Sequence, residues 1–211
     1  MKTDETGHGK IFCLGFPKTG TTSLEVALQH LGYKVCRGNG RNNHTNYLIA
    51  LFVHREYDEL RRMIRHFDAF ADLPWGGTDF YLWLSETYPE ARFIQTIREP
   101  QAWFRSLSNA AHSLDENSET ALESTHAAGH YGAVYLFNKV WQIHSMAGAK
   151  ERLLEIYGQL NSDIESHFAG QDRFFSFALT QERRWDELCD FLDKKVPDRP
   201  FPLENPSQRS R

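Results

Sequence analysis

The sequence predicts an α/β fold of three layers, in which helices flank a central, mostly parallel sheet. Residues 10–16 form a short apolar run that ends at a Gly/Pro turn, as expected of a strand buried on both faces. A helical stripe of Leu24, Leu28 and Leu31 follows at once, and Gly32 ends it. Further apolar runs then alternate with helical patterns, which is typical of a parallel sheet with crossover helices.

The later elements follow the same alternation. Strands are expected at 33–36, 67–71, 91–97 and 173–178. Helices are expected at 45–66, at 79–88, from Pro100 onward, at 131–168 and at 182–193, with a candidate interruption at residues 54–56. Because no linker or repeat divides the chain, residues 1–211 are interpreted as a single domain.

Two segments stand apart from this alternation. Residues 112–130 are polar and read as a loop or a mobile helical segment, and we interpret 112–170 as a helical insertion that contains a candidate lid. Residues 196–211 are rich in proline and end in a basic stretch, so an irregular C-terminal tail is expected.

Composition excludes several classes of protein. The chain has 211 residues, 40% of them hydrophobic, and a net charge of −4, so nothing indicates a nucleic-acid partner. No apolar stretch approaches the roughly 20 residues that a membrane span needs, and residues 1–10 lack the apolar core of a signal peptide. The three cysteines are scattered and odd in number. A reduced, cytoplasmic protein is therefore expected, while the oligomeric state is not predicted.

Residues 17–22, which we call the phosphate loop, read Pro-Lys-Thr-Gly-Thr-Thr between the first strand and the first helix. Gly15, Gly20 and Thr22 match the spacing of the nucleotide-binding pattern G-x-x-x-x-G-K-[ST]. Backbone N–H groups here and at the helix start can hold a phosphate. The sequence therefore predicts a P-loop-type fold, although a simple helix-capping turn is the alternative for this segment alone.

The lysine of that pattern is displaced. Thr21 stands in its place, and Lys18 lies inside the loop instead. The cation that reaches the β- and γ-phosphates of a nucleoside triphosphate is thus missing. This disfavours a kinase of small metabolites, which remains one alternative function.

A second phosphate motif follows the strand at 91–97. Arg98 comes directly after this strand, Pro100 lies in the turn and Ser106 follows eight positions after the arginine. An arginine at the carboxyl end of a strand points into the crevice where α/β sheets bind ligands. Its planar guanidinium group matches a phosphate dianion, and a serine hydroxyl two helical turns on could add a donor.

Together these motifs resemble the sulfotransferase superfamily, whose loop has the form P-K-[ST]-G-T-[TS] and whose second motif pairs an arginine with a serine. The resemblance implies that Lys18, Thr19, Gly20, Thr21 and Thr22 hold the 5′-phosphosulfate end of 3′-phosphoadenosine 5′-phosphosulfate (PAPS). It implies that Arg98 and Ser106 bind the 3′-phosphate.

The resemblance continues over residues 185–205, which look like the end of a compact sulfotransferase branch. The late Arg-Lys-Gly motif of the cytosolic branch has no equivalent, and only Arg209 and Arg211 could replace it.

Catalysis needs a cation beside the leaving oxygen and a base for the acceptor. Lys18 is the candidate cation. In the cytosolic branch a histidine before Leu-Pro is the base, and Asp72 occupies that position here. A partly buried carboxylate can serve as a base, although Asp72 could instead cap the following turn. His44, His54 and His66 are rival candidates.

The implied activity is transfer of a sulfuryl group from PAPS to a hydroxyl or amine of a small acceptor. Many aromatic residues in the middle of the chain favour an apolar or aromatic acceptor. No metal motif is found, since His126 and His130 lack the glutamate of H-E-x-x-H. A non-catalytic nucleotide-binding protein of the same fold is the third alternative.

Overall fold

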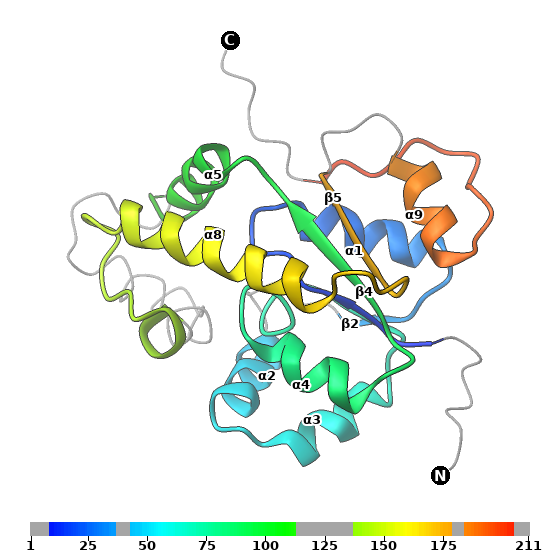
Figure 1. Cartoon of the computed structure of the whole chain (residues 1–211), viewed down its shortest axis with the longest axis horizontal. Helices are drawn as coiled ribbons and strands as arrows, with labels where there is room; N and C mark the ends of the chain where they lie inside the picture. Colours follow the sequence, from blue (N-terminus) through cyan, green and yellow to red (C-terminus); the bar gives the residue numbers. More distant parts are fainter. Residues whose placement is uncertain (1–8, 37–42, 113–136, 179–183, 205–211) are drawn as a thin grey trace.

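The computed structural model describes residues 9–36, 43–112, 137–178 and 184–204 (Figure 1). A five-stranded sheet in the order β2-β3-β1-β4-β5 lies at its centre, and each pair of neighbouring strands is parallel. All the predicted strands are confirmed, several of them shorter than expected. They are β1 (Ile11–Cys13), β2 (Val35–Cys36), β3 (Ala69–Phe70), β4 (Arg92–Ile97) and β5 (Phe174–Ala178).

Helices connect these strands. They are α1 (Thr21–His30), α2 (Asn43–Val53), α3 (Tyr57–Ile64), α4 (Phe80–Thr87), α5 (Pro100–His112), the π-helix η1 (Phe137–Trp141), α8 (Lys150–His167) and α9 (Arg184–Leu192). The predicted interruption at 54–56 is confirmed, because α2 ends before it and α3 begins after it. Arg55, at its centre, has a left-handed backbone with φ 57°.

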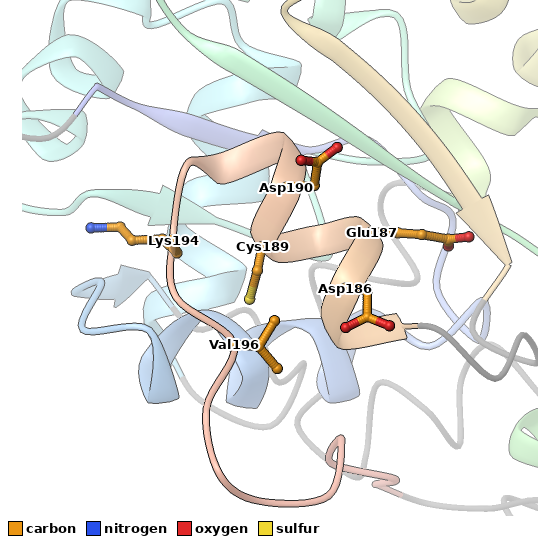
Figure 2. Close-up of a pocket in the computed structure, with 6 residues that line it drawn as sticks. All are labelled: Asp186, Glu187, Cys189, Asp190, Lys194 and Val196. Carbon is orange, nitrogen blue, oxygen red and sulfur yellow. The ribbon is translucent and has the colours of Figure 1, made fainter.

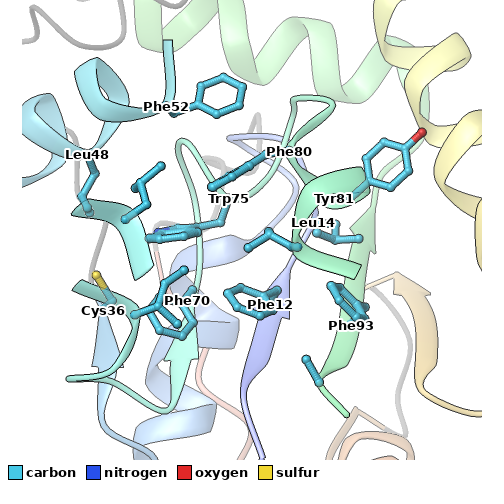
Figure 3. Packing of buried hydrophobic residues seen from close by; sticks show 14 of the residues in the cluster. Phe12, Leu14, Cys36, Leu48, Phe52, Phe70, Trp75, Phe80, Tyr81 and Phe93 are labelled. Atoms are coloured by element: carbon cyan, nitrogen blue, oxygen red, sulfur yellow. The ribbon is translucent and has the colours of Figure 1, made fainter. Parts of the chain in front are cut away.

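The side chains of β1 and of Leu14, the residue after it, bury alternately against different layers. Phe12 and Leu14 pack with residues of α2, α3, α4 and α8 on one face of the sheet (Figure 3). Ile11 and Cys13 pack with residues of α1 and α9 on the other face. Since successive residues of a strand point to opposite faces, this fully buried strand lies between two helical layers. The predicted three-layer α/β fold is confirmed.

The prediction of a largely helical stretch over residues 131–168 is wrong between Trp141 and Lys150. Residues 142–149 form no helix, and residues 131–136 lie outside the described residues. The break depends on tertiary contacts: the Trp141 indole donates a hydrogen bond to Gly77 O at 2.9 Å. Gln142 and Gly148 then take left-handed backbones with φ 56° and 69°. Such a conformation ends a helix, which needs negative φ throughout.

The C-terminal tail is irregular as far as it is described, over residues 196–204. It returns to α1, where the Glu204 N–H donates to Ser23 Oγ at 3.0 Å. The polar segment from residue 113 onward, with His126 and His130, lies outside the described residues. So do Arg209 and Arg211. None of the helices described is both long and apolar enough to cross a membrane.

Candidate active site

The phosphate loop leaves the carboxyl end of β1 against two neighbouring chain segments. A Cβ atom on Gly15 would lie 1.9 Å from Thr96 Oγ1 and 2.8 Å from Thr19 Oγ1. A Cβ atom on Gly76 would lie 2.2 Å from Gly15 O. Real Cβ atoms do not approach other atoms so closely, so both positions require glycine. These contacts fix where the loop starts, between the end of β4 and the turn after β3.

Thr19 shapes the loop from within. Its hydroxyl donates to Phe16 O at 2.6 Å and lies 2.7 Å from Thr96 Oγ1, and the Thr19 N–H also bonds to Phe16 O at 3.2 Å. The side chain is buried. The Thr19 hydroxyl therefore shapes the loop, and the predicted contact of Thr19 with the donor stays a prediction. Lys18 and Gly20 complete that shape with left-handed backbones of φ 73° and 105°.

The start of α1 offers backbone N–H groups to a ligand. Its N-cap is Gly20, which has no side chain to cap the helix, and the first turn contains no acidic residue. The first N–H groups of a helix have no partner within the helix. Beside them lie Thr21, buried, and Thr22, half-buried. A helix start without a side-chain cap, beside a loop that Gly15 and Gly76 allow to pack closely, is suited to bind a phosphate or phosphosulfate group.

Asp72 follows β3 on one side of the phosphate loop, with a left-handed backbone of φ 65°. Part of the side chain reaches solvent, but protein atoms surround the carboxyl group closely. Loss of hydration raises the pKa of Asp72 to about 6. A hydrogen bond from the Leu73 N–H, at 3.0 Å, and the nearby charge of Lys18 oppose that rise. The carboxyl group is therefore suited to accept a proton near neutral pH.

Arg98 follows β4 on the other side of the loop. Its Nη1 donates to Lys18 O at 3.2 Å, so the guanidinium group and the phosphate loop are in direct contact. Lys18 lies between Asp72 and Arg98, close enough to the former to lower its pKa. Three predicted residues from the ends of three neighbouring strands are thus brought together. These contacts bring the three residues together, while their chemical roles stay predictions.

Ser106 lies on α5, half-buried, one turn beyond the buried Trp103. It makes no hydrogen bond to any described residue. Its position along the helix that starts beside Arg98 is compatible with a shared phosphate ligand. The binding role of Ser106 stays a prediction.

The rival bases do not join this cluster. His54 and His66 are exposed, after α2 and α3 respectively, and the side chain of His44 lies outside the described residues. Within the described ranges, no three His, Cys, Asp or Glu side chains gather closely enough to hold a metal ion.

An open hollow lies elsewhere, beside α9 (Figure 2). Its lining residues are Asp186, Glu187, Cys189, Asp190, Lys194 and Val196. None of the predicted site residues lines it. Its carboxylates would repel an anionic donor, so the candidate active site is the cluster around the phosphate loop.

Comparison with known proteins agrees with this geometry. A family model described as a sulfotransferase domain matches residues 10–210. The chain belongs to the sulfotransferase family. A relative from Aspergillus versicolor, named "Ava biosynthesis cluster protein M", is 28% identical over 214 residues, which cover 92% of this chain and 79% of the relative. The family assignment predicted from the loop and from Arg98 is confirmed.

Sequence reasoning missed several residues that support the site of this sulfotransferase. Thr96 contacts the loop through its hydroxyl, and Gly76 lets the turn after β3 approach it. Trp103 donates its indole N–H to Pro17 O at 3.0 Å. Tyr157 bonds to the backbone of Arg98. Only the glycine pair at 76–77 gave a local signal, that of a turn; the other three look like ordinary core residues in the sequence.

Proposed function

We propose that this sulfotransferase moves a sulfuryl group from PAPS to a hydroxyl or amine of a small acceptor by in-line displacement. The observation that carries the proposal is the meeting of Lys18, Asp72 and Arg98 around an uncapped helix start. The Lys18 ammonium group would stabilise charge on the leaving oxygen, and the Asp72 carboxylate, with its raised pKa, would accept the acceptor's proton. The Arg98 guanidinium group would bind a phosphate of the donor.

The donor end is bound by backbone and by charge. The N–H groups at the start of α1 would hold the 5′-phosphate, since helix N-termini favour anions. Arg98 would bind the 3′-phosphate with its planar fork, assisted by Ser106. Lys18 lies within the loop that holds the 5′ end, where its ammonium group would stabilise charge developing on the leaving phosphate oxygen.

The acceptor end is served by Asp72. When bound, the donor supplies the sulfuryl group, whose bond to the phosphate oxygen breaks as the acceptor oxygen or nitrogen bonds to sulfur. The acceptor proton passes to the Asp72 carboxylate, which a pKa of about 6 leaves mostly ionised at neutral pH. The rate should therefore rise with pH through about 6.

The acceptor class is supported by two observations. Aromatic residues are frequent, at 13% of the chain, which favours an apolar or aromatic acceptor. The name of the relative places that protein in a biosynthesis cluster, which supports a metabolite as the acceptor here. A small hydroxylated or amino metabolite is the proposed acceptor.

Calorimetry with 3′-phosphoadenosine 5′-phosphate, compared with ATP and Mg²⁺, tests the donor. We expect binding of the bisphosphate and none of ATP at the same concentration. A Lys18→Met variant should lose about 10²–10³-fold in kcat, because one charge at the leaving oxygen is removed. Lys34→Met is the matched control, since Lys34 is exposed and packs on Phe67, and it should keep full activity. Binding of ATP in preference to the bisphosphate contradicts the proposal.

A further inference from the structure

Tyr157 of α8 uses one hydroxyl to bind both backbone groups of Arg98. It accepts a hydrogen bond from the Arg98 N–H at 3.0 Å and donates one to Arg98 O at 2.9 Å. Arg98 lies one residue beyond Ile97, the last residue of β4 that pairs with β5. The phenol therefore bonds to both backbone groups of the first residue beyond the described pairs of β4 with β5.

The Tyr157 ring is itself held by a second aromatic residue. Trp103 stacks on it with ring centroids 4.2 Å apart and planes 19° from parallel. The Trp103 indole donates to Pro17 O at 3.0 Å, at the start of the phosphate loop. Both rings are buried, with 3% and 0% of their residue surface exposed. One rigid ring pair thus contacts the phosphate loop with one member and the Arg98 backbone with the other.

A polar contact deeper in the sheet anchors α8 in register. Asn161, one turn after Tyr157, accepts a hydrogen bond from Gln95 Nε2 at 2.8 Å. Gln95 lies in the middle of β4 and is fully buried. The Asn161 amide is also a polar neighbour of the Tyr157 hydroxyl. Because buried amides are costly unless bonded, this pair fixes which turn of α8 faces Arg98.

We infer that Tyr157 is a positioning residue that sets the place of Arg98 relative to the phosphate loop, and hence the spacing between the two phosphate-binding elements. The inference rests on the proposed function, because that spacing matters only if one ligand reaches both. A bidentate guanidinium contact is sensitive to such placement, since loss of planar alignment loses its paired hydrogen bonds.

The test is Tyr157→Phe, which removes the hydroxyl and keeps the ring stacked on Trp103. The matched control is Tyr81→Phe: Tyr81 is also buried, and its hydroxyl makes no hydrogen bond in the described part of the chain. We expect the donor KM to rise about tenfold in Tyr157→Phe, as for loss of a buried hydrogen bond, with acceptor KM unchanged. Because Tyr157 touches no reacting atom, kcat at saturating donor should fall less than about threefold, well below the donor effect.

Amide hydrogen exchange separates this inference from the proposed function. In Tyr157→Phe without ligand, the Arg98 N–H should exchange faster, because its acceptor is gone. In the control its exchange should not change. A Tyr157→Phe variant with unchanged exchange at Arg98 overturns the inference, even if the wild type binds 3′-phosphoadenosine 5′-phosphate.

Failure of the wild type to bind the bisphosphate overturns the proposed function instead, and the exchange result still decides whether Tyr157 positions Arg98. If donor and acceptor KM rise together, the residue has a general structural role and the inference is wrong.

Discussion

Replacing Asp72 by asparagine should stabilise the fold at neutral pH while it abolishes catalysis. Asparagine has nearly the same shape, tolerates the left-handed backbone of φ 65° and can accept the hydrogen bond from the Leu73 N–H. The substitution therefore removes the charge and little else. What changes is the free energy needed to keep a carboxylate in a poorly hydrated place.

The magnitude follows from the pKa of Asp72, which rises from 3.8 to about 6 in the folded protein. A shift of about two units corresponds to about 3 kcal/mol. Because part of the side chain is exposed, solvent reduces this, and we expect a gain of about 1–2 kcal/mol for Asp72→Asn at pH 7.5. The pKa of about 6 for Asp72 already includes the attraction between its carboxylate and the Lys18 charge, so this attraction is not counted again.

The sign of this difference in unfolding free energy can be tested by varying pH. The folded state binds the Asp72 proton more tightly than the unfolded state does. Protonation of Asp72 therefore stabilises the folded wild type, and this contribution is fully present below about pH 4. That gain is lost as pH rises through about 6, and the asparagine variant should overtake the wild type there. Urea unfolding at several pH values from 4 to 7.5 measures the difference. Asp79→Asn, which replaces an exposed carboxylate that makes no capping bond, is the control variant.

A stability difference between wild type and Asp72→Asn that stays constant over this pH range would refute the reasoning. It would mean that the carboxyl group has an ordinary pKa and is well hydrated. Near-normal turnover of the variant at pH 7.5 would separately remove Asp72 from the role of base.

Two other predictions concern the frame of the site. Gly15→Ala should destabilise the fold by about 3 kcal/mol or more in urea unfolding, because its Cβ would overlap Thr96 Oγ1 at 1.9 Å. Gly158→Ala, in the interior of α8 with nothing within 4 Å of its Cβ, should instead stabilise by about 0.5–1 kcal/mol; the same sign for both would contradict the packing argument. Glu99→Gln should lower the melting temperature at pH 7 but not at acid pH. Hydrogen bonds from the N–H groups of Gln101 and Ala102 lower the pKa of Glu99, so the stability it gives is lost as pH falls; an equal effect at acid and neutral pH would contradict this.

Much of the fold could be predicted because its signals are local. Each strand is a short apolar run, and β1 is followed by a turn that glycine and proline announce. The break between α2 and α3 shows as three polar residues in a helical pattern. The break after Trp141 has no such signal, since it depends on an indole that bonds to Gly77, 64 residues away. Tertiary contacts of this kind override helical propensity.

The candidate site likewise has residues that could be predicted from the sequence and residues that could not. Lys18, Asp72 and Arg98 could be placed together because each follows a strand, and the carboxyl ends of parallel strands meet at one edge. The inward turn of the Thr19 side chain could not be predicted, because it depends on Thr96, 77 residues further on. The contact of Tyr157 with Arg98 could not be predicted either, because the two residues lie 59 positions apart. In the sequence, a tyrosine in an apolar helical pattern is interpreted as a core residue.

The strand order indicates from which sides the acceptor and the donor would approach in the proposed reaction. In the sheet, β1 lies between β3 and β4, so Asp72 and Arg98 stand on opposite sides of the phosphate loop. In-line displacement needs the attacking atom and the leaving oxygen on opposite sides of the transferred group. Neighbouring strands lie about 5 Å apart, so Asp72, the proposed base, and Arg98, the proposed 3′-phosphate contact, follow strands about two spacings apart, with Lys18 between them. The acceptor should therefore approach from the side of β3 and α2, and the adenosine end should extend toward β4 and α5.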